Sequence, residues 1–128
     1  MTFSAHISHD AVLRARVALL GSGKPLLAER VAAYRILARV SPLAYLPLLA
    51  GALRKYGARE FAHEPAIQLA LLAESVAAAR EMYAREPGRA GLLIDALRAY
   101  GGQLARMERR AEARAADEEI TRLVAGEG

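Results

Sequence analysis

One segment of this chain occurs twice. LLAERVAAYRILARVSP covers residues 26–42, and LLAESVAAAREMYAREP covers residues 71–87. The offset is 45 residues, and the copies share Leu-Leu-Ala-Glu, Val-Ala-Ala, an arginine and the closing proline. We expect a third, more diverged copy at an offset of 44 residues, where residues 116–120 align with residues 72–76. A period of this length is typical of stacked helical units.

A second segment repeats in front of the later copies. ALRKYG at residues 52–57 returns as ALRAYG at residues 96–101, again at an offset of 44 residues. The same offset aligns Glu74 with Glu118, so we expect a helix, a loop and a second helix to repeat together without a gap. Each unit is then a pair of antiparallel helices.

Two glycines lie inside the first helix of these pairs. Gly57 and Gly101 occupy equivalent positions, where glycine costs a helix about 1 kcal/mol relative to alanine. We expect each of them to allow close approach of the paired helix, which would supply small residues, namely Ala73, Ala77 and Ala113. In the second helix of the middle pair we expect Leu72, Ala73 and Val76 to be core.

The composition favours an all-α domain. A chain of 128 residues can form a continuous hydrophobic core without covalent staples. It contains no cysteine, which excludes disulfides and thiolate metal sites. The chain is rich in alanine, arginine and glutamate, and only 5% of its residues are aromatic, which favours helices over sheets.

Start and stop signals predict six helices in one domain. Residues 1–8 are expected to form a flexible N-terminal arm, and residues 9–126 a helical-repeat domain with units at about 9–41, 42–86 and 87–126. Pro42 and Pro47 do not fit inside one unbroken helix, so we expect residues 41–45 to be a connector. The helices are expected at about 9–20, 25–40, 47–62, 65–85, 91–107 and 109–124. The first helix is expected to use Ala11, Val12, Leu13, Val17, Ala18 and Leu20 as its apolar face.

The third unit carries a recognisable pattern. Leu97, Tyr100, Gly101 and Leu104 are spaced Leu-x2-Tyr-Gly-x2-Leu, and Ala113 occupies a small position of the following helix. This pattern resembles the tetratricopeptide repeat, W-x2-L-G-x2-Y followed by A-x3-F.

The second unit repeats the likeness through Leu53, Tyr56 and Gly57, although Glu60 replaces the last aromatic. Ala73 and Asp117 stand where the A-x3-F pattern has an aromatic residue. Because the unit is about ten residues longer than the usual 34, it is most similar to the long tetratricopeptide-like tandem repeats of actinobacterial proteins. The resemblance implies three antiparallel helix pairs stacked as a short right-handed α-solenoid. A HEAT-like stack, with units of about 40–47 residues, is the alternative.

Proteins of the tetratricopeptide family are mostly scaffolds that bind a peptide or a partner protein in a groove lined by the first helix of each pair. The resemblance therefore implies a protein-interaction module. Arg54 and Arg98 occupy equivalent positions, and their planar, forked donors suit carboxylates, so an acidic peptide or a free C-terminus is the expected ligand. The alternative is that both arginines only solvate exposed helix faces. The groove positions implied by the resemblance are Gly51, Arg54, Ala58 and Phe61 in the second unit and Asp95, Arg98, Gly102, Ala105 and Arg106 in the third.

The sequence predicts no enzyme, no cofactor and no metal site. The segment at residues 21–24 resembles a phosphate loop, but Pro25 stands where Ser or Thr is required, and the segment follows a predicted helix rather than a strand. Glu60 and His63 have the spacing of a di-iron ligand pair, but the second copy that such a site needs is missing.

Other partners are judged from charge and polarity. The net charge of +4 permits an acidic partner, and a nucleic-acid-binding accessory protein is a further alternative. The chain has no signal peptide and no apolar run long enough for a bilayer, so we expect a cytoplasmic protein. The sixth helix is polar enough to cap its end of the stack, whereas the first two helices are apolar. A structural homodimer through the N-terminal helices is therefore the second hypothesis.

Overall fold

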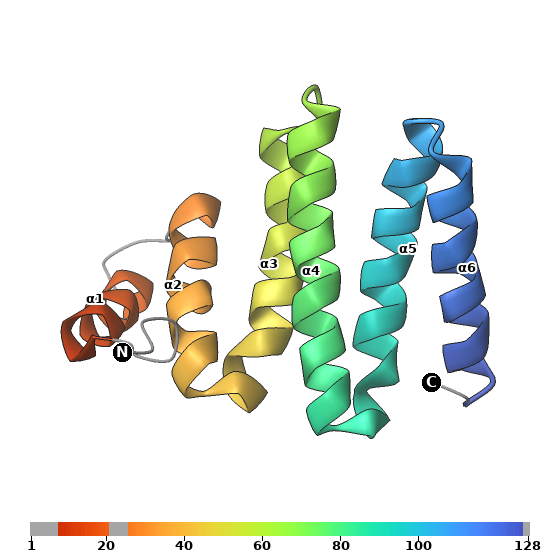
Figure 1. The fold of residues 1–128 in the computed structure, drawn as a ribbon. Helices are drawn as coiled ribbons and strands as arrows, with labels where there is room; N and C mark the ends of the chain where they lie inside the picture. The colour runs from red at the N-terminus through yellow and green to blue at the C-terminus, as the bar shows by residue number, and fades with distance from the viewer. Residues whose placement is uncertain (1–7, 21–25, 127–128) are drawn as a thin grey trace, which may run out of the picture.

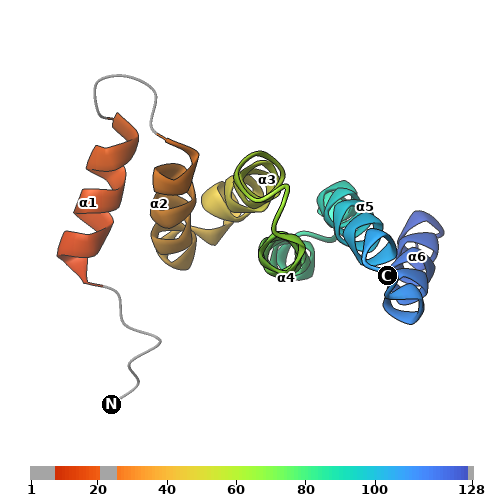
Figure 2. The same cartoon turned by 90° about the horizontal axis from the view of Figure 1, so that it is seen from above.

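The computed structural model describes residues 8–20 and 26–126, and these residues form six α-helices and one short 3₁₀ helix. Most of the predicted N-terminal arm lies outside the described residues. The helices follow one another along a row in chain order. α2 to α6 alternate in direction, whereas α1 lies across them (Figures 1 and 2). The elements are α1 (His9–Leu20), α2 (Leu27–Val40), α3 (Pro42–Glu60), α4 (Pro65–Arg85), η2 (Pro87–Arg89), α5 (Ala90–Arg106) and α6 (Arg110–Val124).

The all-α prediction is confirmed, and no strand occurs in the described ranges. Each helix packs mainly against the helices that precede and follow it in the chain, and α3 also touches α5. The largest fully buried side chains come from α2, α3, α4 and α5. One cluster of buried residues extends from α2 to α6, and Leu37 of α2 belongs to a second, smaller cluster with Ala15 and Ala33. The right-handed solenoid geometry stays a prediction.

The connector expected at residues 41–45 is wrong. α3 begins at Pro42 and continues through Pro47 to Glu60. Pro42 takes the first helical position, where the missing N–H costs nothing because that group has no partner within the helix. Pro47 then removes a single bond, to the carbonyl of Leu43, a solvent-exposed residue where water can take the vacant place. The later proline therefore remains inside the helix, and only Ser41 separates α2 from α3.

Burial repeats between α3 and α5. Leu53 and Leu97 are both fully buried, and they occupy equivalent positions at the offset of 44 residues. Gly57 and Gly101 are buried one turn later. The match between ALRKYG and ALRAYG therefore corresponds to a packing surface that repeats in α3 and α5.

Gly101 approaches the next helix closely, as predicted, whereas at Gly57 an added Cβ would make only ordinary contact. A Cβ added at Gly101 would lie 3.3 Å from the Cβ of Ala116, tighter than ordinary contact. At Gly57 the added Cβ would lie 3.4 Å from the Cγ of Gln68 and 3.7 Å from the Cβ of Leu71. The expected partners of Gly57, Ala73 and Ala77, are instead exposed. Ala73 is therefore not a core residue, whereas the predicted core residues Leu72 and Val76 are buried.

The third unit does not repeat without a gap. Gly57 faces Leu71, 14 residues later, whereas Gly101 faces Ala116, 15 residues later. The first helices of the two pairs are thus offset by 44 residues and the second helices by 45. The structural equivalent of Glu74 is consequently Glu119, and the alignment with Glu118 is wrong by one residue.

The additional residue falls between the matching part of α5 and the start of α6. Glu108 has a φ of 60°, the left-handed conformation typical of the residue that follows a helix end. Its N–H donates to the carbonyl of Ala105 at 3.0 Å, and the N–H of Arg109 donates to that of Leu104 at 2.9 Å. These two bonds satisfy carbonyls at the end of α5. α5 ends at Arg106, two residues beyond the equivalent of the end of α3 at Glu60, and residues 107–109 connect it to α6, whereas residues 61–64 connect α3 to α4.

The apolar face expected for α1 is only partly correct. Ala15 is buried, and Val12 and Leu19 are partly buried against α2. Leu13, Val17 and Leu20 remain 46%, 65% and 84% exposed. The reason is that α1 contacts only α2 among the described helices, so the opposite side of α1 has no partner.

Replacing two helix glycines by alanine should affect stability differently. At Gly51 an added Cβ meets no atom within 4 Å, so Gly51→Ala is expected to raise the free energy of unfolding by about 0.5–1 kcal/mol. At Gly101 the added Cβ would press on Ala116, whose Cβ cannot move without its helix. Gly101→Ala is therefore expected to leave the free energy of unfolding unchanged or to lower it. Chemical denaturation measures both values, and equal stabilisation at the two positions would contradict close packing at Gly101.

Candidate functional site

The predicted groove positions lie on α3 and α5, two helices that contact each other. We call this set of residues the α3–α5 groove. Arg54 is partly buried, and its Nε atom is buried without a hydrogen-bond partner. Arg98 is exposed and forms a long ion pair of 3.9 Å with Asp95. No hydrogen bond or ion pair between described residues joins the α3 members to the α5 members.

Two groove residues are engaged within the fold. The ring of Phe61 packs edge-on against that of Tyr56, with centroids 5.1 Å apart. The Nε and Nη2 atoms of Arg106 donate to Oε1 of Gln103 at 3.1 and 2.9 Å. Gln103 is buried and donates from Nε2 to the carbonyl of Pro65 at 3.3 Å. Arg106 is thus oriented by a residue that ties α5 to the start of α4.

The remaining groove positions are small and open. Ala58 is exposed. A Cβ added at Gly51 would meet nothing within 4 Å, and one added at Gly102 would meet only Nη1 of Arg106, at 3.7 Å. Neither glycine is needed for helix packing, in contrast to Gly57 and Gly101.

An ion pair links α2 to α4, the second helices of the first two pairs. Nη2 of Arg35 donates to Oε1 of Glu74 at 2.7 Å, and Nε donates to Oε2 at 2.8 Å. Donation to the Glu74 carboxylate raises the pKa of Arg35 above its usual value. α2 and α4 have no direct backbone contact in the described chain, so these long side chains span the distance between them.

The same ion pair recurs between α4 and α6. Both terminal nitrogens of Arg80 donate to the carboxylate of Glu119, Nη2 to Oε1 at 3.2 Å. Arg35 and Arg80 are 45 residues apart, as are Glu74 and Glu119. The repeat therefore reproduces an ion pair between units, in which the arginine of one unit bonds the glutamate of the next.

Each ion pair borders a cleft, and the two clefts are also equivalent. The first cleft lies between α2, α3 and α4 and has a volume of about 250 Å³; the second lies between α4, α5 and α6 and has about 400 Å³. Adding 45 residues to positions on α2 and α4, or 44 on α3, converts lining residues of the first cleft into those of the second. The second cleft is lined by Arg80, Tyr83, Ala84, Leu93, Glu119, Arg122 and Leu123, which correspond in this order to residues 35, 38, 39, 49, 74, 77 and 78 of the first.

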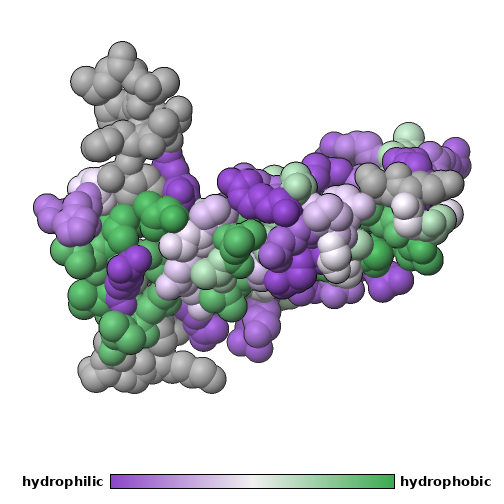
Figure 3. Space-filling view, turned by 90° about the horizontal axis from the view of Figure 1, so that it is seen from below, coloured by the Kyte–Doolittle hydropathy of each residue, from purple (hydrophilic) through white to green (hydrophobic). Residues whose placement is uncertain are grey.

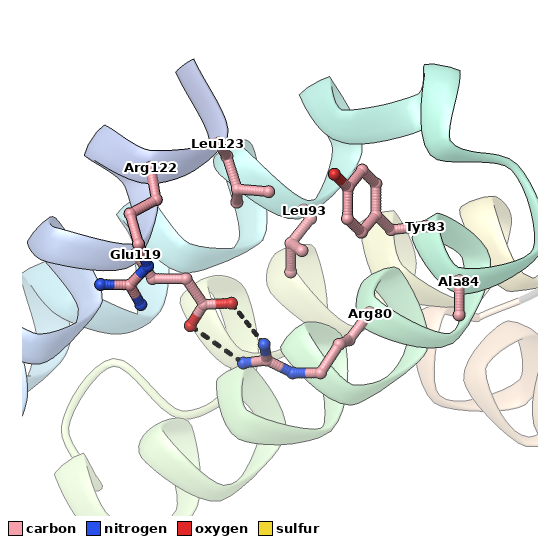
Figure 4. A pocket seen from close by; sticks show the side chains of 7 residues that line it. All are labelled: Arg80, Tyr83, Ala84, Leu93, Glu119, Arg122 and Leu123. Carbon is pink, nitrogen blue, oxygen red and sulfur yellow. Dashed lines mark hydrogen bonds and ion pairs between the residues drawn. The ribbon is translucent and has the colours of Figure 1, made fainter. Parts of the chain in front are cut away.

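Figure 4 shows the second cleft from close by. Leu93 and Leu123 lie between the ring of Tyr83 on one side and the Glu119 and Arg122 side chains on the other. Both leucines are buried, whereas Arg122 is exposed. The cleft thus has an apolar floor and a charged rim.

Sequence reasoning missed the ion pairs and the clefts. The signal was present, because Glu29, Glu74 and Glu119 recur at intervals of 45 residues, as do Arg35 and Arg80. The alignment at 44 residues placed Glu118 in register instead and concealed the third glutamate. In the first unit Oε1 of Glu29 accepts the N–H of Leu26 at 3.1 Å.

Within the described residues, no group of three or more His, Asp or Glu side chains is placed to hold a metal ion. Glu60 and His63 are exposed at the turn between α3 and α4. None of the described helices is both long and apolar enough to cross a membrane.

Comparison with protein-family models, with curated proteins and with solved structures gives no match to this chain. The resemblance to tetratricopeptide repeats therefore depends on the residues quoted for it, and the function has to be inferred from the geometry of the chain itself.

The Arg80–Glu119 pair should contribute modestly to stability. The two side chains are 52% and 22% exposed, so we expect a coupling energy of about 0.5–1 kcal/mol at low salt, which decreases as salt screens the charges. A double-mutant cycle of Arg80→Ala and Glu119→Ala, followed by urea denaturation, measures this value. Arg114→Ala is the control, because Arg114 has no partner among the described residues. A coupling energy of zero at low salt would contradict a role in joining α4 to α6.

Proposed function

We propose that this chain is a protein-interaction module built as a tetratricopeptide-like α-solenoid, and that it binds an acidic peptide along the α3–α5 groove. The main support is the open space beside two glycines. A Cβ added at Gly51 would meet no atom within 4 Å, and one added at Gly102 would meet only Arg106. A helix-interior glycine costs about 1 kcal/mol, and the packing of the described helices does not require these two. Positions without a Cβ on an exposed face allow a ligand backbone to approach closely.

Charge supports an acidic ligand. Arg54 and Arg98 lie beside these small positions, three residues after Gly51 and four before Gly102. The Nε atom of Arg54 is buried without a hydrogen-bond partner, so any bond to a ligand would come from its terminal nitrogens. Arg98 has only the long contact with Asp95. Two guanidinium groups on adjacent, equivalent helices can bind carboxylates of one extended peptide.

The groove is tested with a pool of synthetic peptides that have free carboxyl termini, screened against the full chain. We expect acidic peptides to be enriched, and Arg54→Glu combined with Arg98→Glu to abolish their binding. The control combines Arg110→Glu with Arg114→Glu, which changes the net charge equally on the exposed face of α6. If the acidic peptides bind the Arg54/Arg98 variant and the control equally well, the α3–α5 groove is not their binding site.

Gly51→Ala tests the groove independently of charge. The substitution is expected to stabilise the fold, but its methyl group would occupy the space of the bound backbone. We therefore expect about tenfold weaker peptide binding, or about 1.4 kcal/mol, from a protein that is at least as stable as the original. Fluorescence anisotropy with a labelled peptide from the screen measures the affinity. Unchanged affinity would mean that the ligand does not approach Gly51.

A second candidate function is a structural homodimer through α1. Leu13, Val17 and Leu20 form an exposed apolar stripe opposite α2, and hydrophobic surface gathers at the α1–α2 end of the molecule (Figure 3). At the other end, Arg114, Asp117 and other polar residues cover the outer side of α6. An apolar end and a charged end do not complement each other, so self-association would pair two α1 faces about a twofold axis.

Light scattering over a range of protein concentrations tests the homodimer. We expect twice the monomer mass at high concentration, and Val17→Lys should return the protein to the monomer because it places a charge in the apolar stripe. Arg14→Lys is the control, because it keeps an exposed charge on the same helix. A monomeric mass for the original protein at the highest concentration would reject the homodimer.

A further inference from the structure

We propose that the second cleft binds a small apolar carboxylate, with Arg122 bonding the carboxylate and Tyr83, Leu93 and Leu123 contacting the apolar part. This site lies between α4, α5 and α6 and involves no residue of the α3–α5 groove. It is therefore independent of the proposed peptide binding.

Comparison of the two clefts distinguishes lining residues that recur in both from those that occur only in the second. The Arg80–Glu119 ion pair has a counterpart in the first cleft, so we assign it to the joining of the helices. Tyr83 and Arg122 have alanines at the equivalent positions, 38 and 77. The second cleft thus gains Tyr83 and Arg122, and it has Ala84 where the first cleft has Arg39.

The charges of the second cleft favour an anion. Arg80 and Glu119 bond each other through two nitrogens and two oxygens, so their charges are compensated. Arg122 makes no hydrogen bond or ion pair with another described residue, and its guanidinium group has five donors. The cleft therefore carries one uncompensated positive charge, in the planar geometry that binds a carboxylate through two parallel bonds.

The floor of the cleft favours an apolar body. Leu93 and Leu123 are buried, and Figure 4 shows them between Tyr83 and the charged rim. The Tyr83 ring forms a wall, and its hydroxyl group has no hydrogen-bond partner among the residues described. The second cleft has about 400 Å³, within the range of roughly 300–1,000 Å³ of small-molecule sites. The first cleft, with about 250 Å³, is smaller than this range.

The site is tested with sodium phenylacetate and sodium hexanoate, titrated to millimolar concentrations against the ¹⁵N-labelled full chain. We expect saturable amide shifts at residues 80–84, 93 and 119–123, and none that saturate at the equivalent residues 35–39 and 74–78. Phenylacetamide has the same body without the charge. We expect it to bind about tenfold more weakly, because it cannot form the charge-assisted bonds to Arg122.

Two variants give the second cleft the residues of the first. Arg122→Ala and Tyr83→Ala are each expected to weaken phenylacetate binding about tenfold. Tyr83→Phe keeps the ring packing and the fold, and it should cost much less if the ring rather than the hydroxyl group makes the main contact. Arg114→Ala removes an exposed arginine from the same helix outside the cleft and should leave the affinity unchanged.

Three results would overturn the proposal. The first is that neither acid gives saturable shifts at the second cleft. The second is that phenylacetamide binds as tightly as phenylacetate. The third is that Arg122→Ala binds as tightly as the original protein, because the carboxylate is then bound elsewhere.

Discussion

The structure depends on the constraint that each helix buries its apolar face mainly against helices next to it in the chain. The backbone contacts of the described helices are almost all between sequential neighbours, with α3 and α5 as the one further pair. In such an arrangement the distance between two paired helices determines where the side chains of the outer helix lie. Gly101 and Ala116 set this distance between α5 and α6, and the position of α6 then determines whether Glu119 can reach Arg80 on α4.

The alternation of helices divides the molecule into surfaces with different properties. The first helices of the second and third pairs, α3 and α5, touch each other, whereas α2, α4 and α6 are separated from one another and joined by ion pairs. Clefts therefore form between the second helices, where long side chains span the separation. The small positions Gly51 and Gly102 lie on the first helices. The proposed peptide groove and the proposed carboxylate site therefore lie on different helices of the repeat.

The sequence predicts the helices and the buried glycines well, because both follow from local patterns. It does not predict the position of α3, because whether Pro47 breaks a helix depends on the solvent exposure of Leu43. It also does not predict the register of the third unit. The short match at residues 116–120 favours an offset of 44 residues, although the glutamates and arginines at intervals of 45 residues contain the correct register. The contacts of Ala116 and Glu119 establish it. The second cleft was missed for the same reason, because its equivalence to the first depends on the corrected register. The α3–α5 groove comes from the sequence alone, and the structure adds that its two glycines are free of packing.

The isolation of α1 has a consequence for the dynamics of the chain. Since α1 is held by α2 alone, it can detach while the rest of the core stays intact. The free energy of that opening is smaller than the free energy of global unfolding. The amide protons of α1 would then exchange with solvent through local opening, whereas those of α4, packed between α3 and α5, would exchange only when the whole core opens. Any partner that covers Leu13, Val17 and Leu20 would slow the exchange of α1 selectively.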